Sequence, residues 1–224
     1  MNSNSIISFL SDLKLNNNRE WFAENKNRYD QARTEFEETS KNLINEIAKF
    51  DEDIKHVDVK DCVFRIYRDI RFSNDKTPYK THFGVFIASA GGRKSNRAGY
   101  YLHIDPAGCF VASGIWCPPS ELLKALRKSI YDNIDELNQI ITSPEFTKYF
   151  EKFYDEEKLK TVPPGFPKDF KDAELLKLKH YMVEFKLDDK ILNDINFPQK
   201  IAEILKIAYP LNKFLNYTAD EILF

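Results

Sequence analysis

The hydrophobic pattern of this chain switches from a helical period to strict alternation at Asp51 to Asp53, and this switch constrains the fold most. Before it, apolar side chains recur with a helical period from Ile6 to Leu13 and again from Phe22 to Phe50. Asn16 to Asn18 separate the two stretches and supply capping side chains. The second stretch contains no glycine or proline, so we expect one long helix, bent near Asn25.

The alternating part of the chain predicts a run of β-strands. Ser73-Asn74-Asp75, Gly91-Gly92 and Pro106-Ala107-Gly108 supply turn residues between the alternating segments. Short connections of this kind favour an antiparallel meander. The predicted strands are Val63 to Asp69, Thr81 to Ala88, Tyr100 to Asp105 and Phe110 to Trp116.

Helical patterns return after the strands. Ser120 can cap one helix, Ser143 with Pro144 begins another, and the apolar stripe after Pro198 predicts a C-terminal helix. Between them, His180 to Leu187 could form a further strand. The sequence therefore predicts an α+β fold, with an antiparallel sheet of about four to five strands flanked by N-terminal and C-terminal helices. At 224 residues, we expect residues 1–224 to form a single domain.

Composition narrows the class of protein. The chain is 42% hydrophobic and 30% charged, and no apolar run is long enough for a spanning helix, so we expect a soluble protein without membrane contact. The first residues lack the pattern of a secretory signal. Three cysteines, Cys62, Cys109 and Cys117, form no CxxC pair, which argues against disulfides and structural zinc. A cytoplasmic location fits these features best.

The segment from Lys60 to Gly99 carries nine cationic side chains against three anionic ones, although the whole chain has a net charge of -2. Arginines recur at every third position from Arg65 to Arg71, and period-two phasing would place Arg65, Tyr67 and Arg71 on one face of a strand. Arginine and lysine bind carboxylate and phosphate, and a local excess of them attracts anions. We therefore expect an anionic, phosphate-bearing ligand here, a nucleotide or nucleic acid.

The candidate anion site includes side chains from the next strands, because the same phasing brings Lys80 and His82 beside Tyr101, His103 and Asp105. Asp69 or Asp75 could act as a base or as a magnesium ligand. The candidate ligand-binding residues are Arg65, Tyr67, Arg68, Asp69, Arg71, Asp75, Lys76, Tyr79, Lys80, His82 and His103.

Two alternatives to this site stay open. Asp69 and Asp75 could neutralise the arginines while Tyr67 and Tyr79 pack across strands, which would make the segment a structural network. Exposed arginine and tyrosine side chains could also form a contact surface for a protein partner of unknown identity. The sequence does not decide whether the chain is an enzyme.

Motifs for other chemistries are absent from the sequence. It contains no GxSxG elbow, Walker loop, dinucleotide fingerprint or HExxH pair, so we expect no cofactor and assign no metal site. A site formed by His82 and His103 is conceivable, but ordinary hydrogen-bonded histidines are the preferred interpretation.

The stretch from Arg65 to Lys80 resembles the signature of the bacterial, fungal and plant proteins grouped as domain of unknown function 2461. Asn17 to Phe22, Gly99 to Ile104 and Pro164-Gly165-Phe166 extend the resemblance. Two positions depart from it: Ser113-Gly114 replaces a glycine pair, and Lys168-Asp169-Phe170 stands where a histidine and proline are expected. The resemblance implies a single-domain, mostly cytosolic protein with no established activity or cofactor.

Overall fold

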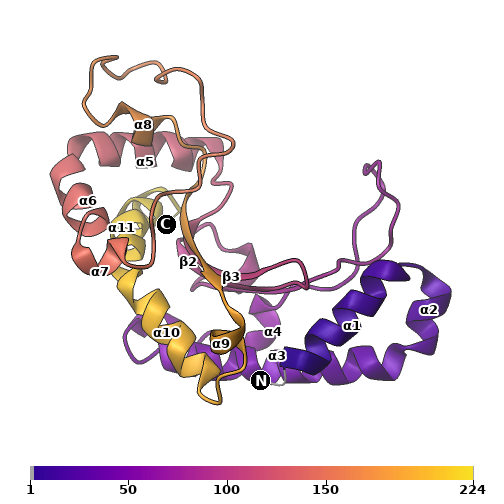
Figure 1. Ribbon diagram of the computed structural model, residues 1–224. Coiled ribbons are helices and arrows are strands. Elements are labelled where there is room, and N and C mark those ends of the chain that lie inside the picture. The colour runs from indigo at the N-terminus through magenta and orange to yellow at the C-terminus, as the bar shows by residue number, and fades with distance from the viewer. Residues whose placement is uncertain (1–2, 224) are drawn as a thin grey trace.

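A computed structural model describes residues 3–223 and shows a four-stranded antiparallel sheet with helices at both ends of the chain, which confirms the predicted α+β class (Figure 1). The strands are β1 (Phe83–Ile87), β2 (Gly99–Ile104), β3 (Cys109–Ile115) and β4 (Tyr181–Leu187), paired in sequence order. No helix in the described part of the chain is both long and apolar enough to cross a membrane.

The N-terminal helices follow the predicted apolar stripes. They are α1 (Ser3–Leu15), α2 (Arg19–Glu24), α3 (Lys26–Ile47) and α4 (Val59–Cys62), with the short 3-10 helix η1 (Glu52–Ile54) between the last two. The predicted bend at Asn25 is a break, since α2 ends and α3 begins on either side of it. Asn18 caps α2 by accepting a hydrogen bond from the Trp21 backbone at 2.8 Å.

The remaining helices lie after the sheet hairpins. They are α5 (Ser120–Asp132), α6 (Ile134–Ile141), α7 (Pro144–Thr147), α8 (Ala173–Leu176), α9 (Asp189–Leu192), α10 (Phe197–Ile207) and α11 (Tyr209–Leu223), and the 3-10 turn η2 (Gly92–Lys94) precedes β2. Ser143 and Pro144 start α7 as predicted. The single predicted C-terminal helix is instead two helices, α10 and α11, that meet at Ala208.

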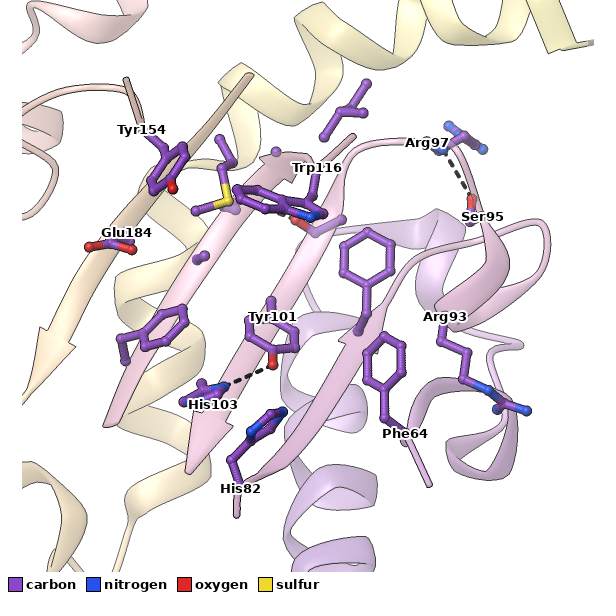
Figure 2. Close-up of a pocket in the computed structure, with 18 of the residues that line it drawn as sticks. Phe64, His82, Arg93, Ser95, Arg97, Tyr101, His103, Trp116, Tyr154 and Glu184 are labelled. Atoms are coloured by element: carbon purple, nitrogen blue, oxygen red, sulfur yellow. Dashed lines mark hydrogen bonds between the residues drawn. The ribbon is translucent and has the colours of Figure 1, made fainter. Parts of the chain in front are cut away.

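Helices α3, α10 and α11 pack on one face of the sheet. That face presents a continuous layer of aliphatic side chains, including Val85, Leu102, Val111 and Val183, which are all fully buried. Because successive strand residues point to opposite faces, the residues between them project to the other face, which these three helices do not cover. That face is the one seen in Figure 2, with helices behind the sheet.

The predicted strand from Val63 to Asp69 is wrong. The segment forms only isolated bridges, Val63 to Val85 and Tyr67 to Tyr79, so its alternating pattern does not produce a fifth strand in the sheet. The chain instead folds back on itself: Arg68 N–H donates to the Pro78 carbonyl at 3.0 Å, and Lys80 N–H donates to the Ile66 carbonyl at 2.8 Å. Local pairing of this kind uses the backbone groups that a sheet neighbour would need. In Figure 1 the resulting loop extends away from the sheet, beside α1 and α2.

Candidate functional site

A cavity of about 510 Å³ lies on the uncovered face of the sheet (Figure 2). Cavities of this size and position commonly hold small molecules. Its wall comes from all four strands and from the loops before β1, before β2, after β3 and before β4. The lining residues are Phe64, Lys80, His82, Phe86, Arg93, Ser95, Arg97, Gly99, Tyr101, His103, Phe110, Ala112, Ser113, Gly114, Ile115, Trp116, Tyr154, Met182 and Glu184.

The sheet register explains the floor of this cavity. Phe86 pairs with Tyr101, Tyr101 with Ala112, and Ala112 with Glu184, so these four side chains form one row across the strands. Two glycines allow close packing beside the row. A Cβ atom on Gly84 would lie 2.6 Å from the Tyr101 hydroxyl, and one on Gly114 would lie 2.1 Å from the Tyr181 carbonyl oxygen. The glycines therefore let the Tyr101 ring and the backbone of β4 pack closely at the floor.

Aromatic rings form most of the wall. Phe64 lies edge-on to Tyr101 at a centroid distance of 6.4 Å, and Phe110 stacks on His103 at 4.6 Å. Arg33 fixes the Phe64 backbone by donating a hydrogen bond to its carbonyl oxygen at 2.7 Å. At the opposite end, Trp116 and Tyr154 lie close together (Figure 2), with ring centroids 5.1 Å apart. Such a wall suits a flat apolar or aromatic group.

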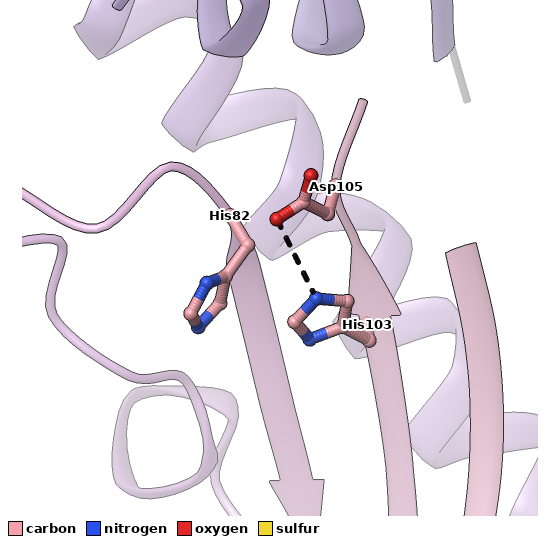
Figure 3. A group of neighbouring side chains, drawn as sticks. All are labelled: His82, His103 and Asp105. Carbon is pink, nitrogen blue, oxygen red and sulfur yellow. Dashed lines mark ion pairs between the residues drawn. The ribbon is translucent and has the colours of Figure 1, made fainter. Parts of the chain in front are cut away.

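Two histidines lie side by side at one end of the cavity (Figures 2 and 3). The rings of His82 and His103 are 4.5 Å apart, and the Tyr101 hydroxyl lies 2.9 Å from His103 Nδ1. Burial, followed by the neighbouring His82, lowers the pKa of His103 to about 4. Burial and the charge of Lys80 lower the pKa of His82. Both imidazoles are therefore neutral near neutral pH.

Asp105 completes this group. Its Oδ2 lies 3.9 Å from His103 Nε2 (Figure 3), and its Oδ1 accepts a hydrogen bond from the Ala107 backbone at 2.7 Å. One ligand atom from each of His82, His103 and Asp105 lies within 4.8 Å of the others. This is the one group of three potential metal-ligating side chains found in the described part of the chain.

The cationic side chains of the cavity wall differ in whether they already form ion pairs or hydrogen bonds within the protein. Arg97 forms ion pairs with Asp53 at 2.7 Å and Asp220 at 3.1 Å, and Arg93 donates to the Lys60 carbonyl at 2.7 Å. Lys80, in contrast, forms no ion pair within the described residues. Its ammonium lies 5.2 Å from the Phe64 ring centroid, and burial and nearby Arg65 lower its pKa. Lys80 is thus a half-buried cation facing the cavity without an anionic partner.

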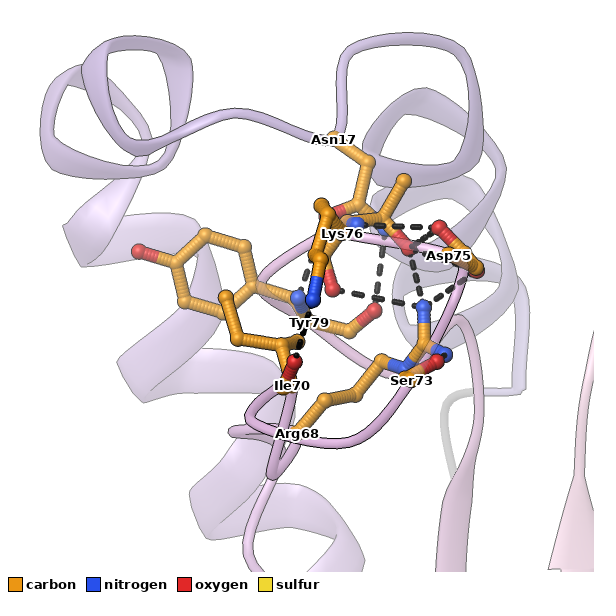
Figure 4. A network of polar contacts seen from close by, with 8 residues as sticks. Asn17, Arg68, Ile70, Ser73, Asp75, Lys76 and Tyr79 are labelled. Atoms are coloured by element: carbon orange, nitrogen blue, oxygen red, sulfur yellow. Dashed lines mark hydrogen bonds and ion pairs between the residues drawn. The ribbon is translucent and has the colours of Figure 1, made fainter.

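Most of the predicted anion-site residues lie outside the cavity, in the loop between α4 and β1 (Figure 4). Arg68 pairs with Asp75 and also donates to the Thr77 hydroxyl. Arg71 pairs with Asp69 at 2.7 Å, and Lys76 donates to the Ile70 carbonyl at 3.0 Å. These contacts match the structural network that the sequence left open as an alternative.

The structure therefore divides the predicted set. Lys80, His82 and His103 line the cavity. Tyr67 and Tyr79 do not; their rings pack against Phe22. Arg65 is exposed and close enough to Lys80 to lower its pKa. Sequence reasoning missed Phe64, Trp116, Tyr154 and Glu184 as lining residues. The alternating pattern of β4 could have predicted Glu184 as a lining residue. Tyr154, in contrast, lies in a loop that no sequence pattern connects to the sheet.

Comparison with known proteins gives one match. The family described as "Conserved hypothetical protein (DUF2461)" matches residues 5–214 of the chain. No curated protein and no solved structure matches it.

Proposed function

The chain belongs to this family of conserved hypothetical proteins, whose description gives no activity, so we propose a function from the cavity. We propose that the cavity binds a small planar molecule that carries a phosphate or a similar anionic group. A nucleotide has both parts. The proposal keeps the class of ligand expected from the sequence but moves its site from the arginine-rich loop to the sheet face.

Lys80 carries this proposal. An unpaired, half-buried ammonium is costly unless it gains an anionic partner, and the lowered pKa of Lys80 reflects that cost. Arg65 adds a second positive charge nearby, and it too forms no ion pair within the described residues. An anionic group beside Lys80 would neutralise both charges.

The rest of the cavity suits the planar part of such a ligand. Phe64, Phe86, Phe110 and Trp116 offer ring faces and edges, and aromatic pairs add about 0.5–1.5 kcal/mol beyond burial of apolar area. A ligand that reaches from Lys80 towards Trp116 would contact the anion-binding end and the aromatic wall together.

A small ligand is favoured over a nucleic-acid strand. Phosphate backbones need several free cations along a groove, whereas Arg68 and Arg71 are paired with aspartates. The free positive charge lies instead at one end of the cavity. Binding should accordingly depend only weakly on salt concentration.

Calorimetric titration with AMP, adenosine and inorganic phosphate tests the proposal, since the last two represent the halves of the first. Lys80→Met should weaken AMP binding by roughly tenfold, about 1.4 kcal/mol, and leave adenosine binding unchanged. Lys76→Met is the matched control, because Lys76 belongs to the same segment but donates to a backbone carbonyl outside the cavity. Absence of binding by all three probes, or equal effects of the two substitutions, would overturn the proposal.

The surface near the arginines gives less support to a protein partner. Phe72 is 96% exposed, and the Arg71 guanidinium lies 5.9 Å from its ring centroid. A protein contact would use a broader apolar patch than this single side chain. Phe72→Ser should therefore leave the oligomeric state and ligand binding unchanged.

A further inference from the structure

We propose that His82, His103 and Asp105 bind a divalent transition-metal ion at the histidine end of the cavity (Figure 3). The proposal is independent of the small-molecule proposal, because it concerns donor atoms that can be tested with the metal alone. Two imidazole nitrogens and one carboxylate oxygen form a donor set typical of zinc and of the neighbouring first-row metals.

The spacing of the donors is compatible with a metal site that contracts on binding. His103 Nε2 and Asp105 Oδ2 are 3.9 Å apart, and the whole set lies within 4.8 Å. Tetrahedral zinc with bonds of about 2.0–2.1 Å needs donors about 3.3 Å apart. Each side chain must therefore move by less than the length of one bond to close around an ion.

The surroundings already orient two of the three ligands. Tyr101 lies 2.9 Å from His103 Nδ1, so a proton on Nδ1 can be donated to the phenol oxygen while Nε2 keeps its lone pair. Ala107 N–H holds Asp105 Oδ1, which leaves Oδ2 towards His103. Outer hydrogen bonds of this kind fix the tautomer and the direction of metal ligands.

The stack of Phe110 on His103, with an interplanar angle of 22°, further restricts rotation of the imidazole. Three protein ligands also leave a coordination position for water or for a small ligand, unlike the closed shell of a structural zinc site. The absence of a thiolate from the set disfavours copper(I).

The charge of Lys80 gives the proposal a second testable consequence. The Lys80 ammonium lies in the wall of the same cavity as His82 and His103. The same charge must oppose a bound cation, so neutralising it should tighten metal binding. Lys80→Met is therefore expected to strengthen zinc binding while it weakens AMP binding. Opposite signs for the two probes separate the two proposals.

The test is titration of chelator-treated protein with Zn²⁺ by calorimetry and with Co²⁺ by visible absorption. We expect one ion per chain and Co²⁺ bands of four- or five-coordinate geometry. His82→Gln and Asp105→Asn should each weaken Zn²⁺ binding by roughly tenfold or more. His56→Gln is the control, since His56 is exposed and outside the cavity, and it should change nothing.

Thermal melts of the metal-free variants show whether each is folded. If Asp105→Asn unfolds, the comparison of His82→Gln with His56→Gln decides the outcome, because His82 precedes β1 and forms no hydrogen bond on which the described fold depends. A stoichiometry well below one ion, or equal Zn²⁺ affinity in His82→Gln and the unmodified protein, would overturn the proposal.

Discussion

Asn17 holds the backbone of Tyr79 through both of its amide atoms: Nδ2 donates to the Tyr79 carbonyl at 2.9 Å, and Oδ1 accepts from the Tyr79 N–H at 3.1 Å (Figure 4). The residues are 62 positions apart. Phe22 stacks on the Tyr79 ring at 4.0 Å with an interplanar angle of 13°. The asparagine-rich turn after α1 and the arginine-rich loop before β1 therefore form one structural unit.

Replacing Asn17 should loosen this unit. Asn17→Ala removes both hydrogen bonds and leaves the Tyr79 peptide, in a buried residue, without its partners, so we expect a loss of about 1–3 kcal/mol in the free energy of unfolding. Asn16→Ala is the control, because the exposed Asn16 side chain only donates to the Asp12 carbonyl within its own helix end. Denaturant unfolding measures both. Equal losses would show that the link to Tyr79 adds no stability.

The sequence predicted the fold where residues repeat with a clear period. Phe36 and Leu205 are fully buried on helices, as their stripes predicted, and the hairpins of β1 to β3 follow the turn residues. The closeness of the His82 and His103 rings could be predicted for the same reason. Phe83 pairs with Ile104 and Gly84 with His103, so neighbouring antiparallel strands bring the two histidines to one face.

The predictions from the sequence failed where contacting residues are far apart along the chain. The pattern from Val63 to Asp69 suits a strand, but only Val63 and Phe64 bond to β1, and the rest of the segment pairs with the chain from Pro78 to Lys80. The sequence also could not show which arginines lack a partner, because the Arg68–Asp75 ion pair depends on the conformation of the loop between them. The cavity wall combines six separate segments of the chain, and no local pattern brings Tyr154 to Trp116.

The two arginines that the sequence treated alike should now behave differently. Arg65→Gln removes a charge near Lys80 and should weaken AMP binding several-fold, whereas Arg68→Gln should leave it unchanged because Arg68 is engaged with Asp75 and Thr77. The Asp75 side chain is 59% exposed, so loss of the pair should cost little stability. Calorimetry and melting curves measure the two effects. Loss of AMP binding in Arg68→Gln would place the loop back in the binding site.

Acid should weaken the loop through Asp75. The Thr77 backbone hydrogen bond, followed by the Arg68 and Thr77 side chains, lowers the pKa of Asp75 to about 2. An unfolded aspartate titrates near pH 3.9, so folding favours the ionised form. The resulting stabilisation is present above about pH 4 and is lost as the pH falls towards 2.

Asp75→Asn should abolish that part of the pH dependence. The difference in melting temperature between the unmodified protein and Asp75→Asn should therefore shrink between about pH 5 and pH 2. Chemical-shift titration of the Asp75 carboxyl group provides a direct check. A titration midpoint near that of an unfolded aspartate would contradict the prediction.

Two leucines test the helix stripes. Leu205 is fully buried in α10, and Leu205→Ala should lower the free energy of unfolding by about 2–5 kcal/mol through the cavity it leaves. Leu15, at the end of α1, is 83% exposed, so Leu15→Ala makes the same chemical change without a cavity and should cost little. Similar melting temperatures for the two variants would show that Leu205 does not pack as described.

Gly114 provides the sharpest test of the cavity floor, because an added Cβ atom there would meet the backbone of the neighbouring strand. It has φ of +125°, and a Cβ atom there would lie 2.1 Å from the Tyr181 carbonyl oxygen in the neighbouring strand. Gly165 is the control, since it also has positive φ, +95°, but an added Cβ would meet nothing within 4 Å. Gly165→Ala should therefore cost only the backbone strain of about 1–2 kcal/mol.

Gly114→Ala adds to that strain a clash with backbone, which cannot rotate away as a side chain can. Overpacking of this kind costs about 1–3 kcal/mol more, and relief requires β3 and β4 to separate where Gly114 pairs with Met182. Since Gly114, Trp116 and Met182 all line the cavity, the substitution should weaken adenosine binding as well as stability. Hydrogen exchange of the β4 amides should rise in Gly114→Ala and not in Gly165→Ala. Equal stability and equal exchange in the two variants would mean that the strands do not approach as closely at Gly114 as the structure indicates.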